Sequence, residues 1–268
     1  MSAYGVFPYV YPIRTAEMKC KERYIGFRFV GKIPKILFPN KDIFTVCYAY
    51  FRWLDDIVDS VRLDPEVVRF KIKREHQFLE LLYGEKETPE ELSTEELFLA
   101  HLVRFDIQHA KNMQEDIERL LSALEFDAKR HGHICSKEEI NRYIENNAIP
   151  YINIALKIFD VFDLPKENLY ELGRCGFIID YINDLKTDIE LGYINIPKEE
   201  LVAYRINLGD FNSAALRQWV QDKLDYLGNQ ISESENGLNR LSGLAGIFAY
   251  FLLRKRKIKL RILKDKWR

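Results

Sequence analysis

The chain is poor in the residues that interrupt or cross-link secondary structure. Its 268 residues include only 13 glycines, 9 prolines and 4 cysteines. The cysteines are far apart and form no Cys-x-x-Cys pair, and the N-terminal residues lack the basic and then apolar pattern of a signal peptide. We therefore expect a reducing, cytoplasmic location. Apolar and polar residues seldom alternate, which argues against a β protein.

The chain also lacks a net charge and several common binding motifs. Forty basic residues against 41 acidic ones give a net charge of −1, so no overall field attracts the protein to nucleic acid. It contains no Gly-x-Gly-x-x-Gly segment and no P-loop, which argues against a nucleotide or NADPH fold. His131 and His133 are two residues apart, whereas two zinc ligands on one helix face need a spacing of four.

Long stretches rich in Leu, Ile, Glu, Lys and Arg indicate a mostly helical protein. With 47% hydrophobic and 13% aromatic residues, the chain can form a large core. No linker or internal repeat divides it, so we expect a single all-α domain over residues 1–268. Caps, prolines and glycines predict helices at roughly 41–60, 65–83, 94–110, 113–130, 136–162 with a kink at Pro150, 165–191, 211–234 and 237–267.

One predicted helix carries three carboxylates in an otherwise apolar segment. At about 100° per residue, Asp55, Asp56 and Asp59 share a stripe with Tyr48 and Arg52. A solvated face of an amphipathic helix would explain the stripe. Aspartate is a poor helix former, however, and three clustered aspartates repel one another unless a cation is bound between them. The row is therefore also a candidate metal site.

A second acid row follows about 125 residues later in the chain. Asp180, Asp184 and Asp188 have the spacing i, i+4, i+8, which places them on one helix face with Asn183 on its flank. Magnesium is typically held by one or two carboxylates plus substrate phosphates. Two such rows facing each other would suit a diphosphate held by metal ions. When this diphosphate leaves an allylic prenyl chain, a carbocation remains on the chain.

Gly173 and Gly176 lie on the same side of this second helix. Each costs roughly 1 kcal/mol relative to alanine within a helix, so both need a reason. Either a ligand comes close to the backbone at these positions, or a neighbouring helix packs closely there.

Two segments resemble the signatures of the squalene/phytoene synthase family. Residues 48–59 (Tyr-Ala-Tyr-Phe-Arg-Trp-Leu-Asp-Asp-Ile-Val-Asp) resemble the first signature, and residues 184–201 resemble the second together with its proline-containing tail. The resemblance covers roughly residues 24–204. It implies a helical isoprenoid synthase bundle with a central cavity, which uses Mg²⁺ to ionise prenyl diphosphates such as farnesyl or geranylgeranyl diphosphate and joins two of them head to head.

The residue pattern and the resemblance together predict the site residues. The predicted catalytic residues are Tyr48, Arg52, Asp55, Asp59, Asp184 and Asp188. The predicted metal ligands are Asp55, Asp56, Asp59, Asp180, Asp184 and Asp188. The predicted substrate contacts are Arg28, Phe51, Ile149, Phe177, Asn183 and Tyr250.

The chain departs from the family pattern where typical members hold the second prenyl chain. Phe177 stands in the place of a glutamine, and Ile149 in the place of a glycine. Arg28 lies where the family has a Ser-x-Ser-Phe segment. Two interpretations of this arginine stay open, a contact to substrate phosphate and a surface charge. These departures leave two alternatives to coupling. One is a cyclase acting on a single prenyl diphosphate, and the other is a non-catalytic descendant that serves as an assembly or interaction protein.

The last predicted helix becomes strongly basic from Arg254 to Arg268. The apolar part of the same helix, residues 241–253, precedes the basic part and is too short to cross a bilayer. Two interpretations stay open for the basic residues. They attract the helix to anionic lipid headgroups as a peripheral membrane contact, or they form an exposed tail that offsets the acidic interior.

Overall fold

The computed structural model describes residues 15, 16, 18, 38–60, 63–84, 86, 91–162 and 164–268. Regular secondary structure in these residues is helical, apart from an isolated bridge between Ile134 and Ile194. The all-α class is thus confirmed. The chain divides into two compact units, unit 1 with Met1–Ala128 and Asn153–Asp160, and unit 2 with Lys129–Ile152 and Val161–Arg268. The single domain over residues 1–268 stays a prediction.

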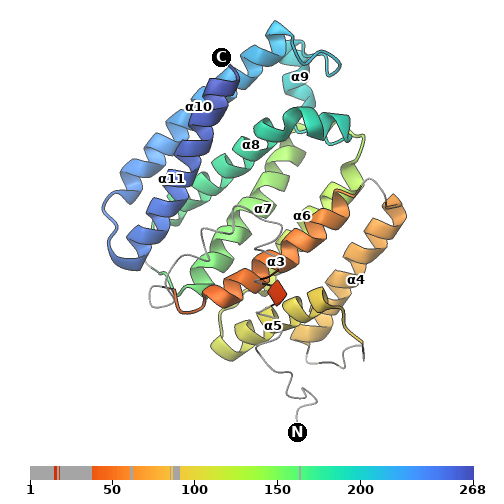
Figure 1. The fold of residues 1–268 in the computed structure, drawn as a ribbon, viewed down its shortest axis with the longest axis vertical. Coiled ribbons are helices and arrows are strands. Elements are labelled where there is room, and N and C mark those ends of the chain that lie inside the picture. Colours follow the sequence, from red (N-terminus) through yellow and green to blue (C-terminus); the bar gives the residue numbers. More distant parts are fainter. Residues whose placement is uncertain are drawn as a thin grey trace. The chain divides into compact units, whose positions relative to one another are not determined.

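Unit 1 is built around the helix that carries the first acid row. It contains α3 (Lys41–Val58), α4 (Pro65–Tyr83), α5 (Thr94–His109), most of α6 (Gln114–Arg130) and the end of α7 (Lys137–Ile158). Helix α3 packs against α5 and α4 (Figure 1). The fully buried Tyr50 on α3 donates a hydrogen bond to Glu75 of α4 at 2.8 Å, which fixes the face of α3 opposite the acid row.

Unit 2 is built around the helix that carries the second acid row. It contains the rest of α7, α8 (Lys166–Glu190), α9 (Lys198–Tyr204), α10 (Ala214–Leu238) and α11 (Gly243–Lys266). Helices α8, α10 and α11 lie side by side in Figure 1, and each packs against the other two. Leu172 and Ile179 of α8 and Trp219 and Leu227 of α10 are fully buried.

Most predicted helix ends are confirmed because their caps form locally. Asp64 accepts a hydrogen bond from the backbone N–H of Glu66, with Pro65 in the first turn of α4. Ser136 and Glu139 exchange side-chain and backbone hydrogen bonds at the start of α7, as expected of a capping box.

The structure differs from the predicted helices at several places, including the start of α11 at Gly243 rather than 237. Helix α7 continues through Pro150 but ends at Ile158 rather than near 162, because Asp160 adopts a left-handed conformation with φ of 54°. The break predicted before 237 is wrong, since α10 continues to Leu238 and contains Gly237. The short α9 was not expected, because its seven residues bury none of their side chains.

Candidate active site

The first acid row occupies the C-terminal end of α3. Asp55 and Asp56 lie in its last turn, and the exposed Asp59 caps it, with its N–H donating to the carbonyl of Asp55 at 2.9 Å. The end of a helix carries partial negative charge, and this last turn contains no basic residue. Three carboxylates at this end therefore create an unfavourable local field that a bound cation would relieve.

Arg52 partly offsets the charge of this row from one turn away. Its Nη1 lies 2.7 Å from Asp55 Oδ2, and its Nη2 lies 2.9 Å from Asp56 Oδ1. Burial raises the pKa of Asp55 to about 7, and the charge of Asp59 acts in the same direction against the lowering effect of Arg52. The structure thus brings together Arg52, Asp55, Asp56 and Asp59. The half-buried Tyr48 lies two turns before Asp55 on α3.

Asp127 is a member of this cluster that the sequence analysis missed. It lies on α6, its residue is only 7% exposed, and its charge contributes to the raised pKa of Asp55. A signal for it exists in the sequence. The buried residues Ile117, Leu120 and Leu124 of α6 predict that position 127 belongs to the same apolar face, where an aspartate is unusual.

The second acid row follows the C-terminal half of α8. Asp180 is paired with Lys259 of α11. Asn183 Nδ2 donates to Asp184 Oδ1 at 2.7 Å, in an exposed turn of the helix. At the end of the row, the half-buried Asp188 accepts a hydrogen bond from Asn195 Nδ2 at 2.9 Å.

The glycines of α8 are explained by helix packing. A Cβ atom at Gly173 would lie 3.3 Å from Cβ of Ala148 on α7. A Cβ atom at Gly176 would lie 2.0 Å from the guanidinium carbon of Arg256 on α11, which is buried and donates through Nε to the carbonyl of Leu172 at 3.1 Å. Of the two explanations considered from the sequence, close packing accounts for both positions.

Phe177 belongs to a cluster of rings around a buried cation. Its ring meets the ring of Tyr143 edge-on, with centroids 6.1 Å apart. The guanidinium of Arg130 lies 4.8 Å from the Tyr143 ring and 5.5 Å from the ring of Tyr193, in cation–π geometry. Tyr143 and Arg130 were not predicted as site residues, because cation–π contacts between distant segments leave no periodic trace in the sequence.

The remaining predicted substrate contacts that the structure describes lie on three different helices. Phe51 is half-buried beside Tyr50 on α3, and Ile149 is half-buried on α7. Tyr250 is 54% exposed on α11, and its hydroxyl accepts a hydrogen bond from Arg254 at 3.1 Å. Arg28 lies outside the described residues.

The carboxylates of the two rows suit a metal ion that takes part of its ligands from a bound phosphate-containing molecule. In the described part of the chain, no three His, Cys, Asp or Glu side chains are grouped closely enough to hold a metal ion by themselves. Magnesium commonly takes one or two protein carboxylates and completes its shell with phosphate oxygens and water. Each row offers such carboxylates, so the residues fit a magnesium–diphosphate complex rather than a protein-only metal cage.

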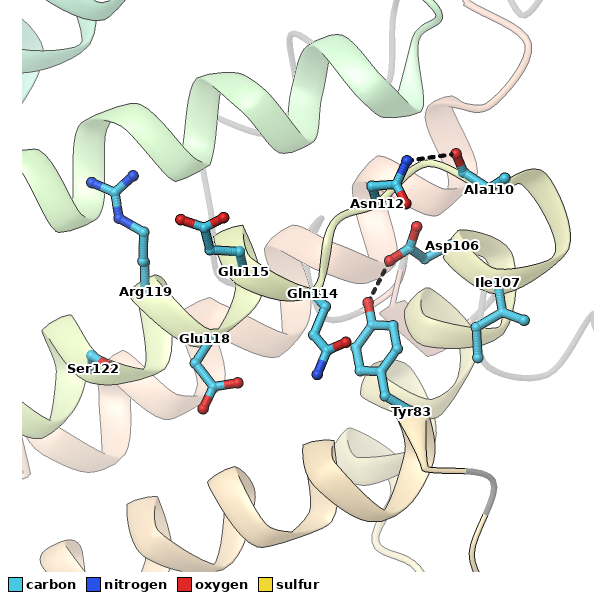
Figure 2. A pocket seen from close by; sticks show the side chains of 10 residues that line it. All are labelled: Tyr83, Asp106, Ile107, Ala110, Asn112, Gln114, Glu115, Glu118, Arg119 and Ser122. Carbon is cyan, nitrogen blue, oxygen red and sulfur yellow. Dashed lines mark hydrogen bonds between the residues drawn. The ribbon is translucent and has the colours of Figure 1, made fainter.

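A cavity of about 710 Å³ in unit 1 lies at the ends of α4 and α5 and the start of α6. Figure 2 shows the residues that line it, including Tyr83, Asp106 and Glu118, and none of them is a predicted site residue. The hydroxyl of Tyr83 and the backbone N–H of Met113 both donate to Oδ2 of the buried Asp106. Asp106 therefore has a structural role in joining α5 to α6.

The fold is that of the all-α isoprenoid synthases. It is similar to the crystal structure of squalene synthase HpnC from Alicyclobacillus acidocaldarius, with a TM-score of 0.75, 18% sequence identity, and coverage of 96% of this chain and 94% of that chain. It is also similar to a dehydrosqualene synthase in complex with a ligand, with a TM-score of 0.68, 16% identity and coverage of 96% of both chains.

A model of the squalene/phytoene synthase family matches residues 40–254, so the chain belongs to this family. A comparison with curated protein sequences gives no match. The family resemblance expected from the two signatures is thus confirmed, whereas the roles of individual residues stay predictions.

Proposed function

We propose that this protein is a Mg²⁺-dependent synthase that ionises a prenyl diphosphate, such as farnesyl or geranylgeranyl diphosphate, and joins two prenyl chains head to head. Family membership supports this class of reaction. The observation that carries the proposal is the first acid row. Its carboxylates crowd the negative end of α3, and burial together with the neighbouring carboxylates raises the pKa of Asp55 to about 7, although one arginine already contacts two members of the row. This arrangement costs stability and favours cation binding.

The residues of the chain have distinct roles in this proposal. Asp55 and Asp59 in one row, and Asp184 and Asp188 in the other, would hold magnesium, which neutralises charge on the departing diphosphate. Arg52 orients Asp55 and Asp56 and supplies a donor for phosphate oxygens. Asn195 holds Asp188, which restricts the rotamers of that carboxylate.

Asp180 has a different role from the one expected of a metal ligand. Its ion pair with Lys259 already compensates its charge. We therefore propose that Asp180 orients α11 against α8 and contributes less to metal binding than Asp184.

A single-chain cyclase is the second candidate function. Phe177 places an aromatic ring against Tyr143 where typical head-to-head members carry an amide, so the side chain at position 177 cannot form a hydrogen bond. A purely non-catalytic role is opposed by the clustered carboxylates, which an interaction protein has no reason to keep.

Product analysis separates these functions. The purified protein is incubated separately with geranyl, farnesyl and geranylgeranyl diphosphate, with magnesium or with EDTA, and organic extracts are analysed by mass. Coupled C30 or C40 products that require magnesium are expected. Single-chain hydrocarbons or alcohols would establish the cyclase instead, and the absence of diphosphate release from all three substrates would contradict both.

The double variant Phe177→Gln/Ile149→Gly probes the same choice. If these residues restrict the protein to one chain, the variant should shift products toward the coupled class. A parent protein that already makes coupled products, with a rate second order in prenyl diphosphate at low concentration, would refute the single-chain alternative.

A cytoplasmic location and a peripheral membrane contact complete the proposal. The membrane contact suits an enzyme whose substrates and products carry long apolar chains. Within the described residues, no helix is long and apolar enough to cross a membrane.

A further inference from the structure

Helix α4 of unit 1 presents large apolar side chains to solvent on the side that does not pack. We define the outward face of α4 as four exposed residues within about 120° of one another around the helix, namely Glu66, Val67, Phe70 and Lys73. Phe70 is 71% exposed and Val67 is 54% exposed, and Leu63, just before the helix, is 40% exposed. On the opposite side, Ile72 and Leu79 are fully buried. Exposed apolar residues grouped in this way are typical of an interaction surface.

Two opposite charges flank Phe70 along the helix. Helical geometry places Glu66 about 6 Å before Phe70 and Lys73 about 4.5 Å after it, both on the same side of the phenylalanine. The side chain of Glu66 is 79% exposed and contacts Arg69 of the same helix through only one carboxylate oxygen, Oε1. Its second oxygen is therefore available to a cation from outside the helix.

Other cations of α4 belong to ion pairs within unit 1. Lys71 Nζ lies 2.8 Å from Glu75 Oε1, and Arg74 Nη2 lies 2.8 Å from Glu96 Oε1 on α5. The exposed Lys73 lies between these two cations in the sequence and belongs to neither pair. Lys73 is therefore the cation of this surface that suits a carboxylate from another molecule.

The pattern of charges around Phe70 is complementary to itself. A two-fold axis at Phe70 would run two copies of α4 antiparallel, so that residues before Phe70 in one copy meet residues after it in the other. Glu66 of each copy would then lie beside Lys73 of the other, with an axial offset of about 1.5 Å that the flexible lysine side chain spans. The symmetry forms this pair twice, once on each side of the two phenylalanine rings.

We propose that a second copy of this chain covers the outward face of α4, in an antiparallel two-fold dimer centred on Phe70. Burial of Phe70 and Val67 supplies the attraction, and the two Glu66–Lys73 pairs set the register. One helix about 28 Å long offers less than the roughly 800 Å² per partner of a standard interface, so we expect a reversible dimer that forms as protein concentration rises. The outward face contains no residue of the acid rows, so this proposal is independent of the proposed function.

Light scattering and sedimentation of the full chain without substrate, over a range of concentrations, test the proposal. Phe70→Ser should raise the dissociation constant of the dimer at least about 100-fold, because one substitution removes two rings from a two-fold interface. The matched control is Phe162→Ser, which removes a phenylalanine of unit 2 that is 62% exposed and should leave the dimer unchanged. A parent protein that is monomeric at every concentration, or equal effects of the two variants, would overturn the proposal.

A charge exchange tests the antiparallel register. Glu66→Lys and Lys73→Glu each place like charges opposite one another twice, so each variant alone should dimerise about 10-fold or more weakly than the parent. An equal mixture of the two variants restores both opposite-charge pairs, so dimers should return in the mixture and weaken with added salt. Circular dichroism checks that both variants are folded. A mixture that stays as monomeric as its components would refute this pairing of the two helices.

Discussion

Replacing Asp55 by asparagine should make the metal-free protein more stable while it destroys the proposed activity. Asp55 lies among Asp56, Asp59 and Asp127, and burial together with these charges raises its pKa from 3.8 to about 7 despite the contact with Arg52. Asparagine keeps the shape and still accepts a hydrogen bond from the guanidinium. It removes the charge that the folded protein disfavours.

The size of the effect follows from the pKa shift. A rise of about 3 units corresponds to about 4 kcal/mol at 1.36 kcal/mol per unit, as an upper bound. The side chain of Asp55 is 35% exposed, so solvent screens these interactions. Some attraction to Arg52 is also lost in the variant. We therefore expect a stabilisation of about 1–2 kcal/mol, or a rise in Tm of roughly 2–6 °C.

The pH dependence has a definite sign. The Asp55 carboxyl ionises near 3.8 in the unfolded chain and near 7 in the folded one. Between these values the folded state holds a proton that the unfolded state has released, so stability falls as pH rises, and the full cost is present above about pH 7. The advantage of Asp55→Asn should therefore be small near pH 4 and largest at pH 8.

Thermal unfolding in EDTA, followed by circular dichroism from pH 5 to pH 8, measures this difference. Asp265→Asn is the control, because it removes one exposed carboxylate near the end of α11 and should change stability by less than about 0.5 kcal/mol. A Tm for Asp55→Asn at pH 8 that equals or falls below the parent value would refute the argument that the row is electrostatically strained.

Two further predictions concern α8 and its neighbours. Gly176→Ala should destabilise the protein by about 2 kcal/mol or more in thermal or urea unfolding, because the new Cβ displaces the buried Arg256 side chain. Gly228→Ala is the control. No atom lies closer than 3.6 Å to its Cβ, so this variant should be neutral or stabilising. Asp184→Asn should lower magnesium-dependent turnover by orders of magnitude, whereas Asp180→Asn should lower it much less. Equal losses of turnover in the two variants would contradict the structural role of Asp180.

Local signals in the sequence were sufficient for most helices. The Ser136–Glu139 capping box and the Asp64-Pro65 start depend on residues within one turn of each other, so the sequence pattern contains the whole interaction. The short α9 buries none of its own side chains. It is held by Glu200, which accepts a hydrogen bond from Trp219 of α10, a contact that no local pattern predicts.

The candidate site shows the same division between local and distant contacts. The spacing of each acid row on its helix could be predicted, because it depends only on helical geometry. The partners that modify the rows could not, since Lys259 is 79 residues from Asp180. Gly176 shows the same limit, because the sequence suggested a close approach but not that Arg256 makes it.

Diphosphate release from farnesyl diphosphate tests the central claim most directly. It is measured for the parent, Asp55→Asn and Asp184→Asn, each with magnesium and with EDTA, after circular dichroism has shown that all three are folded. The account predicts release by the parent only with magnesium, and a loss of orders of magnitude in both variants. Undiminished release by the two variants, or release by the parent that does not depend on magnesium, would contradict it.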